Sequence, residues 1–453
     1  MAPSAEYHPS APVEGVYAFN APGAPVVLHD GPVGRSEGPE TPGTVELRFT
    51  PNPALVWRLP RTDHTFDPLP DETALHIARP YGTVELPAQH RSHEEGWSNG
   101  ATLGDAQAPL QRLIAHWVNL PALRGQHDLV TRIDGAEHTT RRGRWSHETG
   151  GWKITLDVRP GHRDIWKDLH RTHVYAITHV MELSRTDGSV FTPDQAQPIL
   201  RALHMGFSFA LGRWVAPMLP VGLGAPDDRI LWEEWATRLC DPAKAISSGW
   251  WTHWDNEALR MLVTRLVSAC SDPVYAARVD RQLTYAVSVT RDEGFVEQRI
   301  MVGAAGLEHT LWQRFVLSGN MTSAEYGRMP AHKLLRRALQ SASIPLTTDP
   351  EHLPALAALA AARKRDHGAN MDGADLVTWV RNKLVHPTGA EDDVYRFKGA
   401  VTETWLLTRH YLTLLILESL GYQGTYTSMA AGHRYVGERA KVPWATSNAA
   451  DAS

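Results

Sequence analysis

The sequence predicts an α+β multidomain protein in which an N-terminal β-rich domain, sandwich-like or barrel-like, precedes a C-terminal all-α helical bundle. Short alternating runs bounded by Pro, Gly and Thr, such as Thr44–Thr50 and Gly151–Val158, fill the first part of the chain. A period of two is typical of half-buried antiparallel strands. From Asn256 onward apolar residues recur at spacings of three and four, which indicates amphipathic helices. At 453 residues the chain exceeds one ordinary core, so two or three domains are expected.

Composition restricts the partners and cofactors. The formal net charge is −5, so a nucleic acid would have to be recruited by local basic patches. The chain has two cysteines, Cys240 and Cys270, without metal-type spacing, which predicts a reduced cytoplasmic protein without a zinc site. No nucleotide-binding, metalloprotease or hydrolase motif accompanies them, so we expect no cofactor and no metal. The N-terminus has no secretory signal pattern. The longest apolar run, Thr404–Leu420, contains Arg409, His410 and Glu418, which argues against a membrane partner.

We expect a flexible N-terminus at residues 1–16 and a β-rich regulatory domain at residues 17–190. The best strand in this domain is Thr172–Leu183, with His173 and His179 on one face. Together with His170 these histidines suggest a metal site. No Cys, Asp or Glu lies at a compact ligand spacing from them, so ordinary strand histidines are the favoured interpretation.

Residues 191–255 are expected to form a helical and Trp-rich connector. Thr192-Pro193-Asp194 is a plausible helix start, and the helical pattern ends near Pro217. The segment Pro220–Pro226 is rich in Gly and Pro, which indicates a linker or an extended crossing segment. The tryptophans that follow it suggest a ligand surface or a packed domain junction, and burial favours the junction: Trp232, Trp235, Trp250, Trp251 and Trp254.

Residues 256–444 are expected to form the helical domain, and residues 445–453 a disordered tail. In the segment Glu297–Ser318, Ile300, Ala304, Leu307, Leu311 and Phe315 form a core-facing stripe. The other expected helices are Leu259–Cys270, Ala276–Arg291, His332–Gln340, His352–Asp366, a helix from Asp372 or Gly373 to Pro387, and Val401–Leu420.

A group of polar residues lies where one of these helices ends. Arg381, Asn382 and His386 are a cation, an amide and a titratable ring, and Pro387 follows directly. Residues five apart point to different sides of a continuous helix. Pro387 disfavours helical geometry at His386, so His386 can turn back toward Arg381. The alternative is that both side chains only cap the helix end.

This segment resembles the HEPN superfamily, whose nuclease members carry Arg, a polar residue, several variable residues and His at the end of a helix. Arg381-Asn382-Lys383-Leu384-Val385-His386 matches that pattern. The layout is also similar to abortive-infection proteins with a β-rich N-terminal domain before a HEPN domain. The resemblance covers about the last 150 residues well and the rest only in outline. It implies that Glu308 is an acidic site residue and that the domain dimerises.

The chemistry of these residue types fits RNA cleavage by attack of a 2′-OH on the adjacent phosphorus. A histidine suits proton transfer, and arginine supplies permanent charge for the phosphorane. Asn382 can bind phosphate or orient His386. One histidine per chain cannot easily be both acid and base, whereas two sites facing each other in a homodimer supply both. Glu308 either orients Arg381 or makes a simple surface pair.

Two further features concern the partners. The last helix, Val401–Leu420, is apolar beyond one stripe, which indicates either a homodimer interface or central burial in its own chain. Basic side chains near the motif could guide an RNA backbone, although exposed Lys and Arg are more often simple surface charges: Lys383, Arg363, Lys364, Arg365, Arg336 and Arg337.

The sequence therefore predicts a metal-independent endoribonuclease that acts on RNA to give a cyclic phosphate product. We expect an anti-phage, abortive-infection effector with an unknown phage-derived or cellular trigger. The alternative is a non-catalytic HEPN binding or scaffold protein whose β-rich domain binds a protein, nucleotide or glycan.

Overall fold

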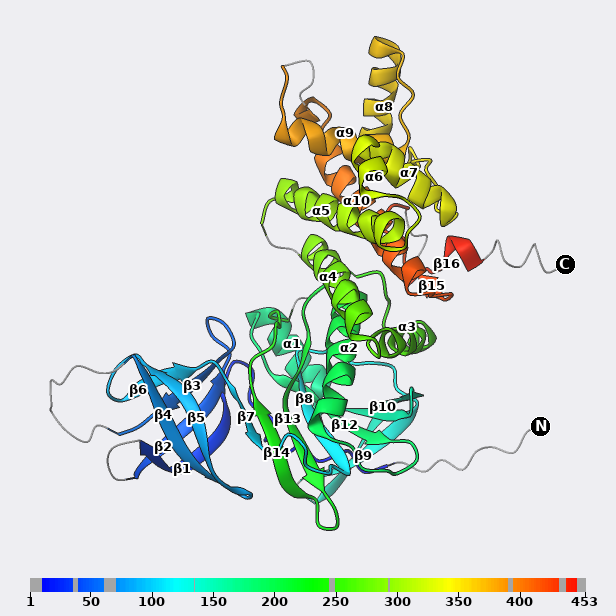
Figure 1. Cartoon of the computed structure of the whole chain (residues 1–453). Helices are drawn as coiled ribbons and strands as arrows, with labels where there is room; N and C mark the ends of the chain where they lie inside the picture. Colours follow the sequence, from blue (N-terminus) through cyan, green and yellow to red (C-terminus); the bar gives the residue numbers. More distant parts are fainter. Residues whose placement is uncertain are drawn as a thin grey trace, which may run out of the picture. The chain divides into compact units, whose positions relative to one another are not determined.

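The computed structural model describes residues 10–35, 40–60, 71–133, 135–243, 249–291, 294–389, 394–431 and 437–445. Two compact units divide the chain, residues 1–204 with 214–246 (unit 1) and residues 205–213 with 247–453 (unit 2). Unit 1 holds a barrel and a large sheet, and unit 2 is mainly helical (Figure 1). The predicted α+β class, with a β-rich first part that includes a barrel and helices after it, is confirmed.

The barrel closes from six antiparallel strands in the order β1-β2-β3-β6-β5-β4. Alternate residues point inward, so Val45 and Leu47 of one strand and Leu75 and Ile77 of another are buried. This alternation is the pattern that predicts strands in the sequence. The barrel strands are β1 (Val26–Arg35), β2 (Thr41–Arg48), β3 (Ala54–Arg58), β4 (Glu72–Arg79), β5 (Gly82–His90) and β6 (Glu95–Ser98).

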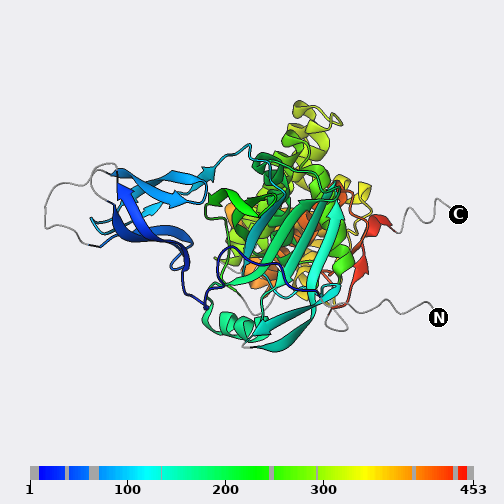
Figure 2. The same ribbon diagram turned by 90° about the horizontal axis from the view of Figure 1, so that it is seen from below.

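The second sheet has eight antiparallel strands in the order β7-β14-β13-β8-β12-β11-β10-β9 (Figure 2). Strand β8 lies near its centre, and six of its seven residues are buried, as expected for a strand covered on both faces. The strands are β7 (Ala101–Gly104), β8 (Arg112–Val118), β9 (His127–Ile133), β10 (Ala136–Thr149), β11 (Trp152–Val158), β12 (Ile177–Arg185), β13 (Ala216–Gly224) and β14 (Arg229–Trp235).

The segment Pro220–Pro226 is not a linker, because most of it belongs to strand β13, which agrees better with the alternative of an extended segment. All nine residues of this strand are buried, and its register shifts between Met218 and Val221. Such a bulge accommodates Pro220, which has no N–H for the ladder. Gly222 packs against Leu110 so closely that a Cβ would collide. The β-rich part therefore extends to Trp235, beyond the expected boundary at residue 190.

The expected strand Thr172–Leu183 is correct only from Ile177. The preceding residues end helix α1 (His162–Thr172), which the sequence pattern did not predict, and His173 is its left-handed C-cap. His173 and His179 thus do not share a strand face. The rings of His162 and His179 lie 5.3 Å apart, but no group of His, Cys, Asp or Glu suited to a metal ion occurs among the described residues.

Residues 10–16 were expected to be flexible, and this expectation is wrong. The N–H of Ser10 donates to Asp128 O (3.2 Å), and the N–H of Val13 donates to the Asp157 carboxylate (2.7 Å). These bonds attach the segment to the sheet. Residues 1–9 and 446–453, also expected to be flexible, lie outside the described residues.

A buried carboxylate connects the barrel and the sheet within unit 1. Glu233 of β14 has no exposed side-chain surface and pairs with Arg79 of β4, at 2.6 Å and 2.8 Å. The hydroxyls of Tyr17 and Tyr81 also donate to it, at 2.5 Å and 2.8 Å. Burial, with the neighbouring Glu233 charge, raises the pKa of both tyrosines. Both hydroxyls therefore remain protonated and act as donors.

Unit 1 contains three buried histidines, so we expect acid to lower its free energy of unfolding. Burial lowers the pKa of His116 and His162 to about 4, and that of His179 well below its usual value. Unfolded histidine titrates near pH 6.5, so the unfolded state binds more protons below that pH. The free energy of unfolding should be highest above about pH 6.5 and should fall by about 1 kcal/mol per pH unit for each histidine as the pH drops toward 4.

Urea unfolding at pH 7.5, 6.5 and 5.5 measures this effect. His116→Gln should reduce the pH dependence, and the exposed His138→Gln should leave it unchanged. Equal pH dependence in all three proteins would contradict the assignment of His116.

Unit 2 contains a helical bundle, and the expected helices lie close to the observed ones. Helix α2 (Pro193–Leu211) spans the division between the units. The predicted helix Glu297–Ser318 is α5 (Val296–Trp312) continued by a π-helical turn, Gln313–Leu317. The other helices are α3 (Asn256–Ala269), α4 (Pro273–Thr290), α6 (Ser323–Arg328), α7 (Ala331–Ser341), α8 (Pro354–His367), α9 (Gly373–Val385) and α10 (Ala400–Ser419).

Helix α10 is the central helix of unit 2. It contacts α4, α5, α7, α8 and α9, and every residue from Leu407 to Leu417 is buried. Its apolar character is therefore explained by packing within its own chain. The expectation that α10 offers surplus apolar surface to a second copy is wrong.

Four of the five tryptophans after β13 are buried, as the packing interpretation predicts, and Trp254 is exposed.

Cys240 and Cys270 are buried free thiols. Among the described helices, none is long and apolar enough to cross a membrane.

Candidate functional site

Helix α9 carries the Arg-Asn-x-x-x-His segment, and its first turn is strongly fixed. Asp372 is the N-cap and accepts from the N–H of Asp375 (3.0 Å), while Asp375 accepts from the N–H of Asp372 (3.2 Å). This reciprocal capping satisfies free N–H groups of the first turn. Gly373 lies against the Tyr411 hydroxyl of α10 with no space for a Cβ. These contacts set the position of α9 on the bundle.

The helix ends as the sequence predicts. Val385 is its last residue, and His386 is the C-cap with φ −129° and ψ 73°, outside the helical region. The His386 N–H donates to Asn382 O (2.7 Å). The His386 side chain is exposed at this end.

A cavity of about 420 Å³ lies between α5, α7 and α9. Small side chains make the space, because Ala304 and Ala305 of α5 and Ala331 of α7 line it. The neighbouring Gly303 and Gly306 face Thr408 and Leu412 of α10 and pack closely there. The Gly-Ala-Ala-Gly run thus gives α5 one close-packed side and one open side.

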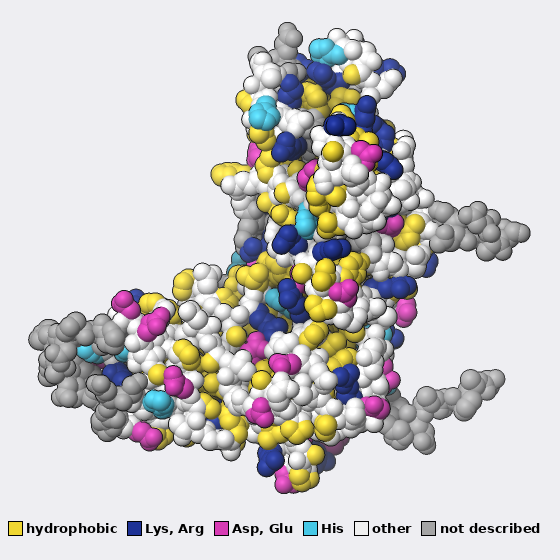
Figure 3. Space-filling view, viewed as in Figure 1, with side chains coloured by type: hydrophobic (Ala, Val, Ile, Leu, Met, Phe, Trp, Pro, Cys, Tyr) yellow, Lys and Arg dark blue, Asp and Glu magenta, His cyan; other side chains and the backbone are white. Residues whose placement is uncertain are grey.

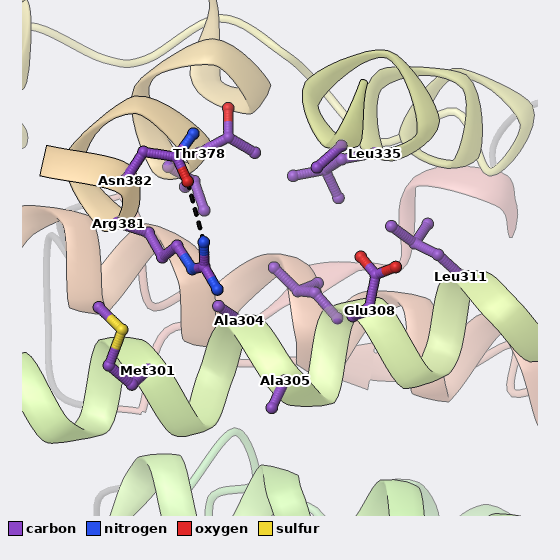
Figure 4. Close-up of a pocket in the computed structure, with 12 residues that line it drawn as sticks. Met301, Ala304, Ala305, Glu308, Leu311, Leu335, Thr378, Arg381 and Asn382 are labelled. Atoms are coloured by element: carbon purple, nitrogen blue, oxygen red, sulfur yellow. Dashed lines mark hydrogen bonds between the residues drawn. The ribbon is translucent and has the colours of Figure 1, made fainter. Parts of the chain in front are cut away.

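Three of the four predicted catalytic residues line this one cavity. Arg381 and Asn382 reach it from α9, and Glu308 reaches it from α5 (Figure 4). The Arg381 guanidinium donates to the Asn382 side-chain oxygen (3.0 Å). His386 is not among the lining residues. The structure therefore brings Arg381, Asn382 and Glu308 together and places His386 at the exposed helix end beyond them.

The Glu308 carboxylate has a partner other than Arg381. Tyr326 of α6 donates its hydroxyl to Glu308 Oε1 (2.8 Å), and burial, with this bond, raises the pKa of Tyr326. Within the described residues, no hydrogen bond or ion pair joins Glu308 to Arg381. The expected orientation of Arg381 by Glu308 is thus not seen, and Tyr326 holds the carboxylate instead.

The predicted RNA-binding side chains fall into different environments on unit 2, whose surface shows Lys and Arg where α7 and α8 lie (Figure 3). Arg363 of α8 and Lys383 of α9 both lie over the ring of Trp379, at 5.1 Å and 5.9 Å. Lys364 and Arg365 are exposed in the last turn of α8, where positive charge stabilises the helix. Arg337 is exposed and lies over Phe315.

Arg336 differs from the other predicted RNA-binding residues, because its guanidinium is occupied by two carboxylates at the start of α9. Its guanidinium donates to Asp372 (2.6 and 3.1 Å) and to Asp375 (2.7 Å), the two residues that cap α9. The hydrogen bond to Asp372, with the second bond to Asp375, raises the pKa of Arg336. Arg336 therefore connects α7 to the start of the helix that carries the site.

We expect Arg336→Met to lower the free energy of unfolding of unit 2 by about 1–3 kcal/mol, because charged hydrogen bonds at a helix cap are lost. Arg337→Met on the next residue is the matched control and should change it by less than about 0.5 kcal/mol. Thermal unfolding measures both. Equal stability of the two variants would show that the Arg336 ion pairs contribute little.

Comparison with known proteins finds two family matches. Residues 105–246 match the family model described as the YopA central domain, and residues 272–441 match the one described as the YopA C-terminal domain. Both matches are to YopA. The first covers strands β8 to β14 and omits the barrel, and the second covers all residues that line the cavity, together with His386.

A similar curated protein is the SPbeta prophage-derived uncharacterized protein YopA of Bacillus subtilis (strain 168). The chains are 27% identical over 311 residues, which is 67% of this chain and 66% of the relative. The match thus spans just under two thirds of the relative's length. No solved structure matches the chain.

Sequence reasoning missed three residues of the site. Thr378, one turn before Arg381, lines the cavity, and a spacing of three could have indicated it. Tyr326 holds Glu308 from an element that begins with a Thr-x-x-Glu capping box at Thr322, which was not recognised. Trp379 stands beside the motif, and only the structure shows that Arg363 and Lys383 both contact it.

Proposed function

We propose that the chain is a metal-independent endoribonuclease of the HEPN type, acting through the helix end that carries Arg381, Asn382 and His386. The observation that carries this proposal is the cavity in which Arg381 and Asn382 of α9 meet Glu308 of α5, beside a helix that ends at His386. Within the described residues no metal-type cluster accompanies the cavity. The proposed chemistry uses these side chains for attack of the 2′-OH on the adjacent phosphorus.

Each side chain has a role that its chemistry permits. Arg381 donates one N–H to Asn382. Its remaining N–H groups can bind a phosphate in bidentate fashion and neutralise the phosphorane. The exposed His386 ring can transfer a proton to or from solvent-accessible RNA. Lys383 and Arg363, which both lie over the ring of Trp379, can attract the backbone.

A homodimer through the helical domain belongs to this proposal, because one His386 per chain cannot easily be both acid and base. The buried α10 does not supply the interface, so the contact would use the outer faces near the end of α9. Light scattering should give twice 50.2 kDa. A strictly monomeric, active enzyme would refute this part alone.

We further propose an anti-phage role of the abortive-infection kind, with the β-rich unit responding to a phage-derived or cellular trigger. The prophage origin in the name of the similar YopA protein supports a place in phage–host conflict. Expression of the wild type should arrest growth and degrade RNA, whereas His386→Ala should do neither. Equal growth arrest by both proteins would contradict the proposal.

A non-catalytic binding protein is the second candidate, and one observation favours it. His386 does not line the cavity that holds Arg381, so the cavity could bind a ligand without cleavage. If that ligand is RNA, the protein would bind RNA and leave it uncleaved.

A further inference from the structure

The cavity beside Arg381 has walls unlike those of a phosphate site. Eight of its twelve lining residues are apolar, and a volume of about 420 Å³ lies within the 300–1,000 Å³ range of small-molecule pockets. An RNA backbone is polyanionic and needs cations or N–H donors. A nucleobase differs, because its faces are apolar and its polar atoms lie along one edge. The apolar walls therefore suit a base rather than a phosphate.

The Glu308 carboxylate narrows the choice of base. It would repel a phosphate, so the part of an RNA ligand that contacts Glu308 must carry hydrogen-bond donors, and the N–H groups on the edge of a base are such donors. Tyr326 occupies part of Oε1 only, and a carboxylate can accept about four hydrogen bonds in all. Glu308 can therefore accept two more bonds, side by side. Guanine presents two adjacent donors, N1–H and N2–H, on its Watson–Crick edge, whereas adenine, cytosine and uracil present donors on only one atom there.

The positions of the charges agree with this ligand. In Figure 4 the Arg381 side chain extends from α9 toward Ala304, and Glu308 lies farther along α5, with its carboxylate beside Leu311 and below Leu335 in this view. A nucleotide has its phosphate and its base edge at opposite ends. Arg381 at one end and Glu308 at the other match that polarity.

We propose that the cavity binds the guanine base of an RNA nucleotide whose phosphate contacts Arg381, with Glu308 as the residue that selects guanine. This inference rests on the proposed ribonuclease function for its RNA substrate. It adds the base specificity of cleavage.

The test uses DNA oligonucleotides with one ribonucleotide, which is rG, rA, rC, rU or an abasic ribose. Cleavage rates are measured for the wild type, Glu308→Gln, Ala304→Phe and Ala360→Phe. Ala304→Phe fills the cavity. Ala360→Phe is the matched control, because Ala360 is half-buried on α8 and does not line the cavity. Calorimetry with guanosine 3′-monophosphate and adenosine 3′-monophosphate gives a readout that does not depend on cleavage.

We expect the wild type to cleave the rG substrate at least about tenfold faster than the others, since a matched pair of hydrogen bonds contributes about 1–3 kcal/mol of discrimination. Glu308→Gln should reduce this preference to a few-fold, because its amide offers one acceptor. In Ala304→Phe the ratio of rG to abasic rates should approach one, and Ala360→Phe should keep the wild-type ratio.

Equal wild-type rates on all five substrates would overturn the guanine proposal while the ribonuclease proposal stands. If no substrate is cleaved, the ribonuclease proposal fails. Calorimetry then tests on its own whether the cavity binds guanine. Guanosine 3′-monophosphate binding that is lost in Ala304→Phe and kept in Ala360→Phe would support it. Absence of binding, or equal binding of both nucleotides, would overturn it.

Discussion

Replacement of either Arg381 or His386 by alanine is expected to lower RNA cleavage by about 100-fold or more, because loss of a general acid or base or of a charge that stabilises the transition state has effects of this size. In the proposed mechanism Arg381, which lines the cavity, neutralises the phosphate, and His386, the C-cap of α9, transfers the proton. Initial rates on a labelled RNA, with far-UV circular dichroism of each variant, measure both activity and folding.

The fold should survive both changes. Arg381 is half-buried and His386 is exposed, so each substitution should cost less than about 2 kcal/mol, the upper limit for loss of a helix cap. Arg337→Ala, an exposed arginine on α7, is the control for lost surface charge and should reduce cleavage only modestly. Full activity in either site variant would remove the basis for the ribonuclease assignment.

Glu233→Ala should destabilise unit 1 strongly, by about 3–5 kcal/mol, because it leaves a buried cation without its counter-charge. Arg79 and the hydroxyls of Tyr17 and Tyr81 all donate to this carboxylate. Glu46→Ala is the control, since its pair with Arg48 is more exposed and surface pairs contribute about 0–1 kcal/mol. Urea unfolding compares the two, and similar midpoints would show that the Glu233 network is not a major source of stability.

The helix end at Pro387 was predictable because its cause is local. Pro387 restricts the backbone of His386 whatever the rest of the chain does, and the observed C-cap angles agree. The stripe on α5 was predictable for the same reason, since Ile300, Leu307 and Leu311 are all buried. The sequence did not predict that Ala304, Leu307 and Leu311 of this stripe also line the cavity.

Features set by distant partners were not predictable. Strand β13 has the composition of a linker, and only its neighbours β8 and β14 make Gly222 and Pro220 part of a sheet. In the sequence Arg336 resembles an ordinary surface cation. In the structure it pairs with Asp372 and Asp375 at the start of α9, 36 and 39 residues farther along the chain. The apolar sequence of α10 fits both a dimer interface and a central helix, and packing in unit 2 decides for the central helix.

The most direct test of the ribonuclease proposal is incubation of the purified chain with a 5′-labelled RNA in excess EDTA, followed by analysis of the product ends. The proposal predicts cleavage that EDTA does not reduce, with 5′ fragments ending in a 2′,3′-cyclic phosphate or its hydrolysis product, and none of these fragments with His386→Ala. Intact RNA, an absolute need for Mg²⁺ or Mn²⁺, or the same fragments from His386→Ala would contradict it.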